Sequence, residues 1–221
     1  MLDEKTRYLQ IAFNYDTRMV GQLLPRIPHS SRILVEAGTP YIKREGMAGI
    51  RYIRRLWPGV VVADMKVADG ALGEVQLARA AGANAITVLG NAPRETLNLF
   101  INECQRLNMV SMIDMISVKD PLDVIRLLRE PPDVIVLHLG RDEETTRGKL
   151  IQYRHVNRIR SKFPSLISAA GGVDVRAARS AIFNGANIVV ANIVQESDAW
   201  KGISADEDIG VMAKKFLETI E

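Results

Sequence analysis

The chain has 221 residues, of which 47% are hydrophobic, 25% are charged and 5% are aromatic, a composition that suits one globular domain with a substantial core. Its net charge is +3, but the 29 basic and 26 acidic residues are interspersed, so no block of charge indicates a nucleic-acid partner. The N-terminus carries no apolar targeting segment, no apolar run reaches membrane-spanning length, and a single buried-looking cysteine, Cys104, excludes a disulfide within the chain, so we expect a cytoplasmic protein without a membrane partner.

Short apolar runs rich in β-branched residues recur about every 20 to 30 residues along the chain. The stretches between them, such as 72–81, 96–107 and 175–183, have apolar residues at helical spacing, and a final helix is expected over 205–220. Eight such repeats predict a single (β/α)8 TIM barrel over residues 1–221, with an open, doubly wound sheet as the alternative. The expected strands are 9–14, 33–36, 60–64, 85–89, 110–114, 134–138, 166–170 and 188–192.

Polar residues or glycines close most of these expected strands. Barrel active sites are built at the carboxyl ends of the strands, so these residues would meet at one end of the barrel. Each of them alone could be a helix cap or a satisfied core group, but their shared location favours a site. The closing residues are Asn14, Glu36, Asp64, Asp114, His138, the pair Gly171-Gly172, and Asn192.

The end of the third strand carries three charged residues within six positions, Asp64, Lys66 and Asp69. Side chains alternate along a strand, so Asp64 and Lys66 are expected on one face, and Asp69 follows on the turn into the next helix. Such a cluster can bind a metal, hold an anion or shift a pKa, and the alternative is a solvated turn with an ion pair.

The strand-end residues suggest proton-transfer chemistry beside a carbonyl. Glu36 and Asp64, on neighbouring strands, would offer oxygen ligands to Mg²⁺, which could stabilise an enediolate formed next to a sugar carbonyl. His138 would be the general base or acid. Lys66, kept protonated by the nearby carboxylates, could stabilise the developing oxyanion.

A phosphate-binding turn is expected after the seventh strand, where Gly171 and Gly172 precede a helix that starts near Asp174. A tight turn without a ligand is the alternative. Arg141, three residues after His138, could also reach an anionic substrate, or it could pair with the acidic residues that follow it.

The D-x-K-x-x-D motif formed by Asp64, Lys66 and Asp69 resembles the hallmark of the orotidine 5'-phosphate decarboxylase suprafamily. The resemblance extends over nearly the whole chain, and within the suprafamily it is strongest to 3-hexulose-6-phosphate synthase. The sister group, 3-keto-L-gulonate 6-phosphate decarboxylase, has an arginine at the position of Arg141. True orotidylate decarboxylases carry a lysine where this chain has Glu36. The segments that resemble the synthase are 35–46, 63–66, 70–74, 80–83, 88–92 and 170–173.

The resemblance implies a homodimeric barrel with shared active sites, in which Asp69 is delivered into the partner's site. It implies Mg²⁺ held by Glu36 and Asp64, with an enediolate stabilised by the metal and Lys66. A synthase would use this intermediate to join formaldehyde to D-ribulose 5-phosphate, and the reverse reaction would release formaldehyde. Residues expected to bind the sugar phosphate are Asn14, Arg141, Gly171, Gly172, Ala191 and Asn192.

Three positions depart from the synthase pattern. Asn14 replaces an aspartate, Val67 replaces a threonine, and Ala191-Asn192 replaces Gly-Arg or Gly-Gly after the eighth strand. These changes leave three hypotheses: a divergent synthase, a decarboxylase-like enzyme acting on another sugar phosphate, and a non-catalytic phosphosugar-binding protein. Asp114 and Glu74 are further candidate site residues, with structural hydrogen bonding as their alternative.

Overall fold

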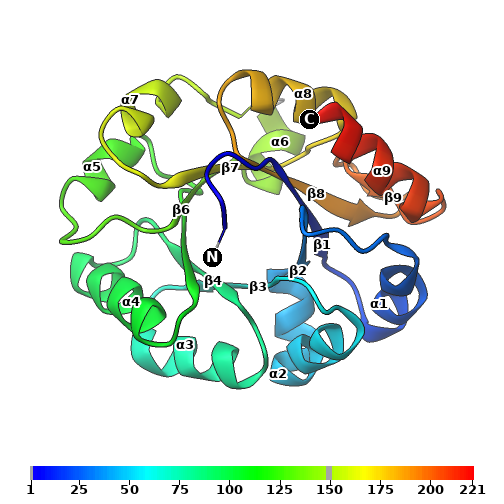
Figure 1. Ribbon diagram of the computed structural model, residues 1–221, viewed down its shortest axis with the longest axis horizontal. Coiled ribbons are helices and arrows are strands. Elements are labelled where there is room, and N and C mark those ends of the chain that lie inside the picture. Colours follow the sequence, from blue (N-terminus) through cyan, green and yellow to red (C-terminus); the bar gives the residue numbers. More distant parts are fainter. Residues whose placement is uncertain (1, 148–150) are drawn as a thin grey trace.

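The computed structural model describes residues 2–147 and 151–221, and it forms a single (β/α)8 TIM barrel (Figure 1). Each of the eight barrel strands pairs in parallel with the next, and β1 pairs with β8 to close the barrel. The predicted barrel is therefore confirmed, and an open, doubly wound sheet is excluded. The barrel strands are β1 (Tyr8–Phe13), β2 (Ile33–Ala37), β3 (Val61–Val67), β4 (Ala85–Leu89), β5 (Val110–Asp114), β6 (Val134–His138), β7 (Leu166–Ala170) and β8 (Ile188–Val194).

Helices surround the barrel, as Figure 1 shows. The final helix, α9, begins at Ile209, later than the expected start at residue 205, because the Asp208 side chain caps it by accepting hydrogen bonds from the Gly210 and Val211 amides. A short strand, β9 (Ile203–Ser204), which the sequence pattern does not predict, pairs with β8 outside the barrel. The helices are α1 (Thr17–Leu23), the 3-10 helix η1 (Leu24–Arg26), α2 (Thr39–Leu56), α3 (Ala71–Ala80), α4 (Arg94–Arg106), α5 (Pro121–Ile125), α6 (Arg141–Arg147), α7 (Val156–Arg160), α8 (Val175–Phe183) and α9 (Ile209–Thr219).

Strand alternation divides the apolar residues between two cores. One set of side chains points outward and packs under the helices, as Leu9, Ile11 and Phe13 do on β1, whereas the other set fills the barrel interior. Cys104, on α4, is buried in the outer core, as expected. The interior set contains Tyr8, Ala12, Leu34, Val62, Ala85, Met112, Val134, Val136, Leu166, Ala170, Ile188 and Val190.

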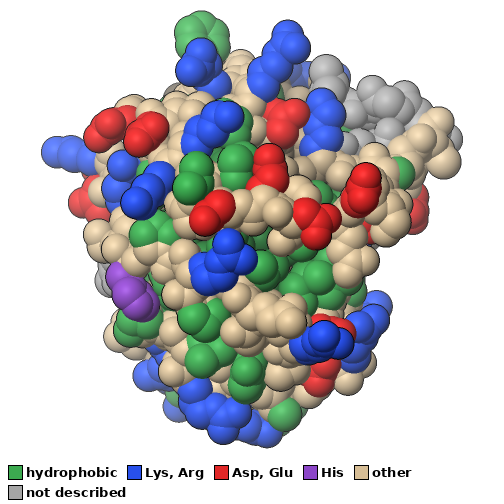
Figure 2. Space-filling model, turned by 90° about the vertical axis from the view of Figure 1, so that its right-hand side faces the viewer, with side chains coloured by type: hydrophobic (Ala, Val, Ile, Leu, Met, Phe, Trp, Pro, Cys, Tyr) green, Lys and Arg blue, Asp and Glu red, His purple; other side chains and the backbone are tan. Residues whose placement is uncertain are grey.

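The surface carries charges of both signs. On the face shown in Figure 2, basic and acidic side chains are interspersed over the upper part, and Lys and Arg gather at the lower edge. No helix within the described ranges, 2–147 and 151–221, is long and apolar enough to cross a membrane.

Gly38 fixes the approach of α2 to the end of β1. It is the N-cap of α2, and a Cβ at this position would collide with the Asn14 side-chain oxygen and crowd the Phe13 carbonyl oxygen. A glycine is therefore required where the second βα turn passes the end of the first strand.

We predict that Gly38→Ala lowers the free energy of unfolding by about 1 to 3 kcal/mol, because the new methyl group has no space. Gly73→Ala is the matched control, since a Cβ on this exposed α3 residue would meet no atom within 4 Å. It should stabilise the protein by about 0.5 to 1 kcal/mol through helix propensity. Urea denaturation of both variants measures the difference, and equal effects would contradict the packing argument.

Candidate active site

A cavity of about 280 Å³ opens at the carboxyl ends of the barrel strands, where the sequence predicts a site. The inward-facing side chains nearest the carboxyl ends of the strands are polar, whereas those deeper in the barrel are apolar. The cavity is therefore lined by charged and amide groups above an apolar floor. The predicted site residues that line it are Asn14, Glu36, Asp64, Lys66, Asp114, His138, Arg141, Gly171 and Asn192.

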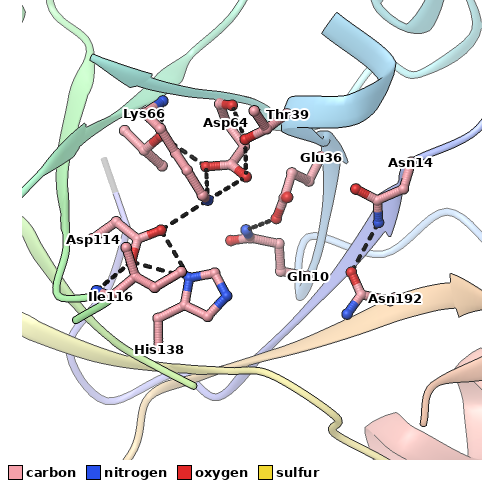
Figure 3. A network of polar contacts seen from close by, with 11 residues as sticks. Gln10, Asn14, Glu36, Thr39, Asp64, Lys66, Asp114, Ile116, His138 and Asn192 are labelled. Atoms are coloured by element: carbon pink, nitrogen blue, oxygen red, sulfur yellow. Dashed lines mark hydrogen bonds and ion pairs between the residues drawn. The ribbon is translucent and has the colours of Figure 1, made fainter. Parts of the chain in front are cut away.

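Lys66 lies at the centre of a network of charges (Figure 3). Its Nζ donates to Asp64 Oδ1 at 2.9 Å and Oδ2 at 2.7 Å, and to Asp114 Oδ2 at 2.9 Å. Asp114 Oδ2 also lies 2.8 Å from His138 Nδ1. One ammonium group therefore joins two carboxylates, and through Asp114 it is linked to the histidine.

The backbone of β3 is irregular where it carries this lysine. The pairing register with β4 shifts between Ala63 and Val67, and Lys66 has a φ of 47° in the left-handed region. Such a φ is uncommon for a residue with a side chain, and bulges of this kind re-aim side chains next to functional sites. Simple alternation along the strand therefore does not explain the direction in which the Lys66 side chain points.

Two threonines, neither of them predicted from the sequence as a site residue, hydrogen-bond to Asp64 and Lys66. Thr87 Oγ1 accepts from the Lys66 amide at 2.9 Å and donates to Asp64 Oδ1 at 2.8 Å. Thr39 Oγ1 donates to Asp64 Oδ2 at 2.8 Å. A hydroxyl inside the apolar run of β4, and another directly after Gly38, were the available signals in the sequence.

The charges in this network stabilise one another. Burial acts to lower the pKa of Lys66, but Asp64 and Asp114 outweigh it and raise the pKa above the ordinary lysine value. Burial acts to raise the pKa of Asp114, but His138 and Lys66 hold it below the ordinary aspartate value. At neutral pH Lys66 is therefore a cation and Asp114 an anion.

Glu36 differs from these two groups, since it is buried without a cation in direct contact among the described residues. Burial and the charge of Asp64 raise the pKa of Glu36 to about 7. Gln10 Nε2 donates to Glu36 Oε2 at 2.5 Å, while Gln10 Oε1 has no hydrogen-bond partner in the described part of the chain. Gln10 was also missed from the sequence, where it appears as a polar residue inside the first apolar strand.

The donor set fits Mg²⁺. Glu36 and Asp64 present hard carboxylate oxygens to the same cavity, and a divalent cation would offset the burial and the charge of Asp64 that together raise the pKa of Glu36. Within residues 2–147 and 151–221, no group of three or more His, Cys, Asp or Glu side chains is arranged to hold a metal ion. Water or substrate oxygens would have to complete the coordination, as is usual for Mg²⁺.

The opposite side of the cavity carries neutral amides and one arginine. Asn14 Nδ2 donates to Asn192 Oδ1 at 2.9 Å, linking the ends of β1 and β8. Arg141, at the start of α6, lines the cavity and stacks on Trp200, with its Cζ 4.5 Å from the ring centroid. Gly171 has a φ of 105°, and a Cβ there would collide with the Leu139 carbonyl oxygen, so close backbone packing by itself requires this glycine.

Some predicted residues lie away from the cavity. Asp69 is exposed on the turn between β3 and α3, and Glu74 lies in the first turn of α3. Ala191 is buried in the outer core, under the helices. Gly172 follows Gly171 but does not line the cavity. The roles predicted for these residues stay predictions.

Comparisons with known proteins agree with this architecture. The model of the orotidine 5'-phosphate decarboxylase / HUMPS family matches residues 7–199. Similar relatives include a "Bifunctional enzyme Fae/Hps" of Methanothrix thermoacetophila, 36% identical over 97% of this chain and 53% of its own length. One of the same description from Methanocaldococcus jannaschii is 40% identical over 76% of this chain and 42% of its own length. The chain thus spans about half the length of the curated relatives it matches.

Solved structures show the same similarity. The crystal structure of 3-hexulose-6-phosphate synthase from Salmonella typhimurium superposes with a TM-score of 0.83 at 25% identity, covering 96% of this chain and 98% of that one. KGPDC from Streptococcus mutans superposes with a TM-score of 0.75 at 17% identity, over 97% of each chain, which shows a shared fold.

We predict that Lys66→Met destabilises the protein by about 3 kcal/mol, because it leaves buried carboxylates without their cation. Lys43→Met, on the exposed face of α2, is the matched control and should change stability by less than about 0.5 kcal/mol. Thermal denaturation at neutral pH measures both variants. A Lys66 variant as stable as the control would show that the ammonium does not neutralise the site.

Proposed function

This chain belongs to the orotidine 5'-phosphate decarboxylase / HUMPS family, and from that premise we propose that it is a lyase of the 3-hexulose-6-phosphate synthase type. It would join formaldehyde to D-ribulose 5-phosphate through an enediolate, and catalyse the reverse reaction. The observation that carries the proposal is the ammonium of Lys66, hydrogen-bonded to both Asp64 and Asp114 at the cavity. Similarity to the solved synthase supports it.

The reaction begins with the loss of a proton from C1 of the sugar phosphate, next to the C2 carbonyl. The electron pair of the C–H bond becomes the second bond of a C1=C2 double bond, the π pair of the C2 carbonyl moves onto its oxygen, and negative charge develops there. Lys66 carries the positive charge that would stabilise this oxygen. Carbon C1 then attacks formaldehyde, whose oxygen takes up a proton to become the new hydroxyl group.

His138 is the group we assign to proton transfer. Asp114 lies 2.8 Å from His138 Nδ1, so a proton on that nitrogen is held in a hydrogen bond. In Figure 3 the other ring nitrogen, Nε2, points away from Asp114 toward the side of Gln10 and Asn192. In the neutral ring that nitrogen has a free lone pair, which makes it the candidate base for the C1 proton.

Glu36 and Asp64 are the residues that would hold Mg²⁺ in this proposal. When bound, the ion would supply Lewis-acid polarisation of the sugar oxygens. Gln10 would orient the Glu36 carboxylate through its 2.5 Å hydrogen bond.

The sugar phosphate would be bound by the opposite rim. Asn14 and Asn192 offer amide groups to the sugar hydroxyls, and Arg141 offers a guanidinium to the phosphate. Gly171 brings backbone close to the same side of the cavity. The resemblance also implies that Gly172 and Ala191 bind the substrate, and that role is part of this proposal.

We also propose a cytoplasmic homodimer with shared active sites. The exposed position of Asp69, outside the cavity of its own chain, supports this arrangement because its carboxylate is accessible to a second subunit.

A second candidate activity is metal-assisted decarboxylation of 3-keto-L-gulonate 6-phosphate. The position of Arg141 on the cavity favours it, because the decarboxylase group carries an arginine at this position.

The synthase proposal predicts formaldehyde-dependent consumption of ribulose 5-phosphate by the purified chain with Mg²⁺. A chelator should abolish the activity, and added Mg²⁺ should restore it. Lys66→Ala should lower kcat/KM by about 10²- to 10³-fold, because an oxyanion-stabilising group is lost. Lys43→Ala, an exposed lysine on α2, should match the wild type.

Absence of condensation by folded wild-type protein would contradict the synthase proposal. Lys66-dependent release of CO₂ from 3-keto-L-gulonate 6-phosphate would then favour the decarboxylase. Loss of both activities with retained binding of sugar phosphates would leave a binding protein.

A further inference from the structure

Gln10 is a polar residue in an apolar layer of the barrel interior. It lies on β1 between the inward-facing Tyr8 and Ala12, and its register partners on the two adjacent strands are Leu34 and Val190. Gln10 is only 3% exposed. An amide buried among apolar side chains costs free energy unless its donors and acceptors have partners. We therefore looked for the partners of both ends of this amide.

The side chain of Gln10 reaches one layer upward, to the floor of the cavity. Ala12, the next inward-facing residue on β1, is the register partner of Glu36 on β2, and its small side chain leaves room for the longer glutamine. Gln10 Nε2 donates to Glu36 Oε2 at 2.5 Å, and Gln10 lines the cavity. A residue from the apolar layer thus presents an amide to the site.

The two ends of this amide face different surroundings. A carboxylate only accepts hydrogen bonds, so the NH₂ group faces Glu36 and the carbonyl oxygen, Oε1, must point elsewhere. In Figure 3 Oε1 points away from Glu36, toward the side of Lys66 and His138. It is buried and has no hydrogen-bond partner among residues 2–147 and 151–221. The bond to Glu36 therefore fixes an acceptor of defined direction inside the cavity.

The donors of the charged network are directed to other acceptors. Lys66 Nζ donates to Asp64 and Asp114, and the Thr87 hydroxyl donates to Asp64. His138 is bonded to Asp114 through Nδ1, and in the neutral ring that has its proton there, Nε2 is an acceptor. These contacts leave Gln10 Oε1 as an acceptor that a hydroxyl group of a bound molecule can use.

The proposed reaction indicates which hydroxyl group this is. His138 Nε2, the candidate base for the C1 proton, points toward the side of Gln10. Carbon C1 would therefore lie on this side, and in ribulose 5-phosphate C1 carries a hydroxyl group as well as the proton that is removed.

We propose that Gln10 is a specificity-determining residue whose Oε1 accepts a hydrogen bond from the hydroxyl group on C1 of the substrate. Gln10 thereby selects hydroxymethyl ketones over methyl ketones, because a ligand without this hydroxyl leaves the buried oxygen unpaired. The identity of the ligand as a sugar phosphate rests on the proposed function.

The test compares the binding of ribulose 5-phosphate with that of its 1-deoxy analogue, which has a methyl group at C1. Isothermal titration calorimetry without formaldehyde gives both Kd values. Wild-type protein should bind ribulose 5-phosphate about threefold to tenfold more tightly, the factor expected for one hydrogen bond to a neutral group. Gln10→Met keeps the length of the side chain without its amide, and its ratio of Kd values should fall to about one. Gln22→Met, on the exposed face of α1, is the matched control and should keep the wild-type ratio.

The ratio separates a contact with the substrate from support of Glu36. Loss of the hydrogen bond to Glu36 would change the affinity for both compounds alike, whereas loss of the acceptor changes only their ratio. The wild-type ratio should also persist when Mg²⁺ is removed by a chelator, because the amide and the hydroxyl group are in direct contact. A ratio that appears only with Mg²⁺ would assign the selectivity to the metal and overturn the proposal.

Two further outcomes would overturn the role of Gln10. One is equal affinity of wild-type protein for the two compounds, and the other is an unchanged ratio in Gln10→Met. If Gln10→Met does not fold, Gln10→Leu, which suits the apolar layer, takes its place beside the wild-type measurement. Failure of condensation by a wild-type protein that still prefers ribulose 5-phosphate would overturn the proposed function and leave the role of Gln10 in binding intact.

Discussion

The ammonium group of Lys66 is the interaction on which the rest of the site depends. It donates to Asp64 and Asp114, both buried, in a cavity that also contains the buried Glu36. Buried carboxylates that lack a cation are costly, so removing this one charge would leave the barrel mouth with uncompensated negative charge. The same ammonium group therefore neutralises the buried carboxylates in the folded protein and, in the proposed reaction, stabilises an oxyanion.

The position of that ammonium follows from the barrel and from one local departure from regular structure. Parallel strands bring Asp64 and Asp114 to the same edge, and the bulge at the end of β3 turns Lys66 between them. Thr87 fixes the bulge by accepting from the lysine amide. The far rim is built differently, from the loops that follow the strands. The barrel strands thus position the charged groups at the centre of the cavity, whereas loop contacts position substrate-facing groups such as Arg141.

The sequence predicts the elements that depend on burial. Continuous β-branched runs indicate the barrel strands because both faces of a parallel strand are covered, and a polar residue or glycine at the end of most runs indicates the cavity. Gln10 and Thr87 were missed because each lies within an apolar run and not at its end, where the site residues were expected. Trp200 was missed for another reason: the segment between β8 and β9 that carries it has no periodicity, and the contact of Trp200 with Arg141 depends on loop conformation.

Proton exchange at C1 of ribulose 5-phosphate tests the central claim most directly, because it reports enediolate formation without formaldehyde. The substrate is incubated with enzyme and Mg²⁺ in D₂O, and the C1 protons are followed by NMR. The account predicts loss of a C1 proton signal with wild-type protein and no loss with Lys66→Ala. Exchange that persists in Lys66→Ala, or a wild-type enzyme that binds the sugar phosphate without exchange, would contradict it.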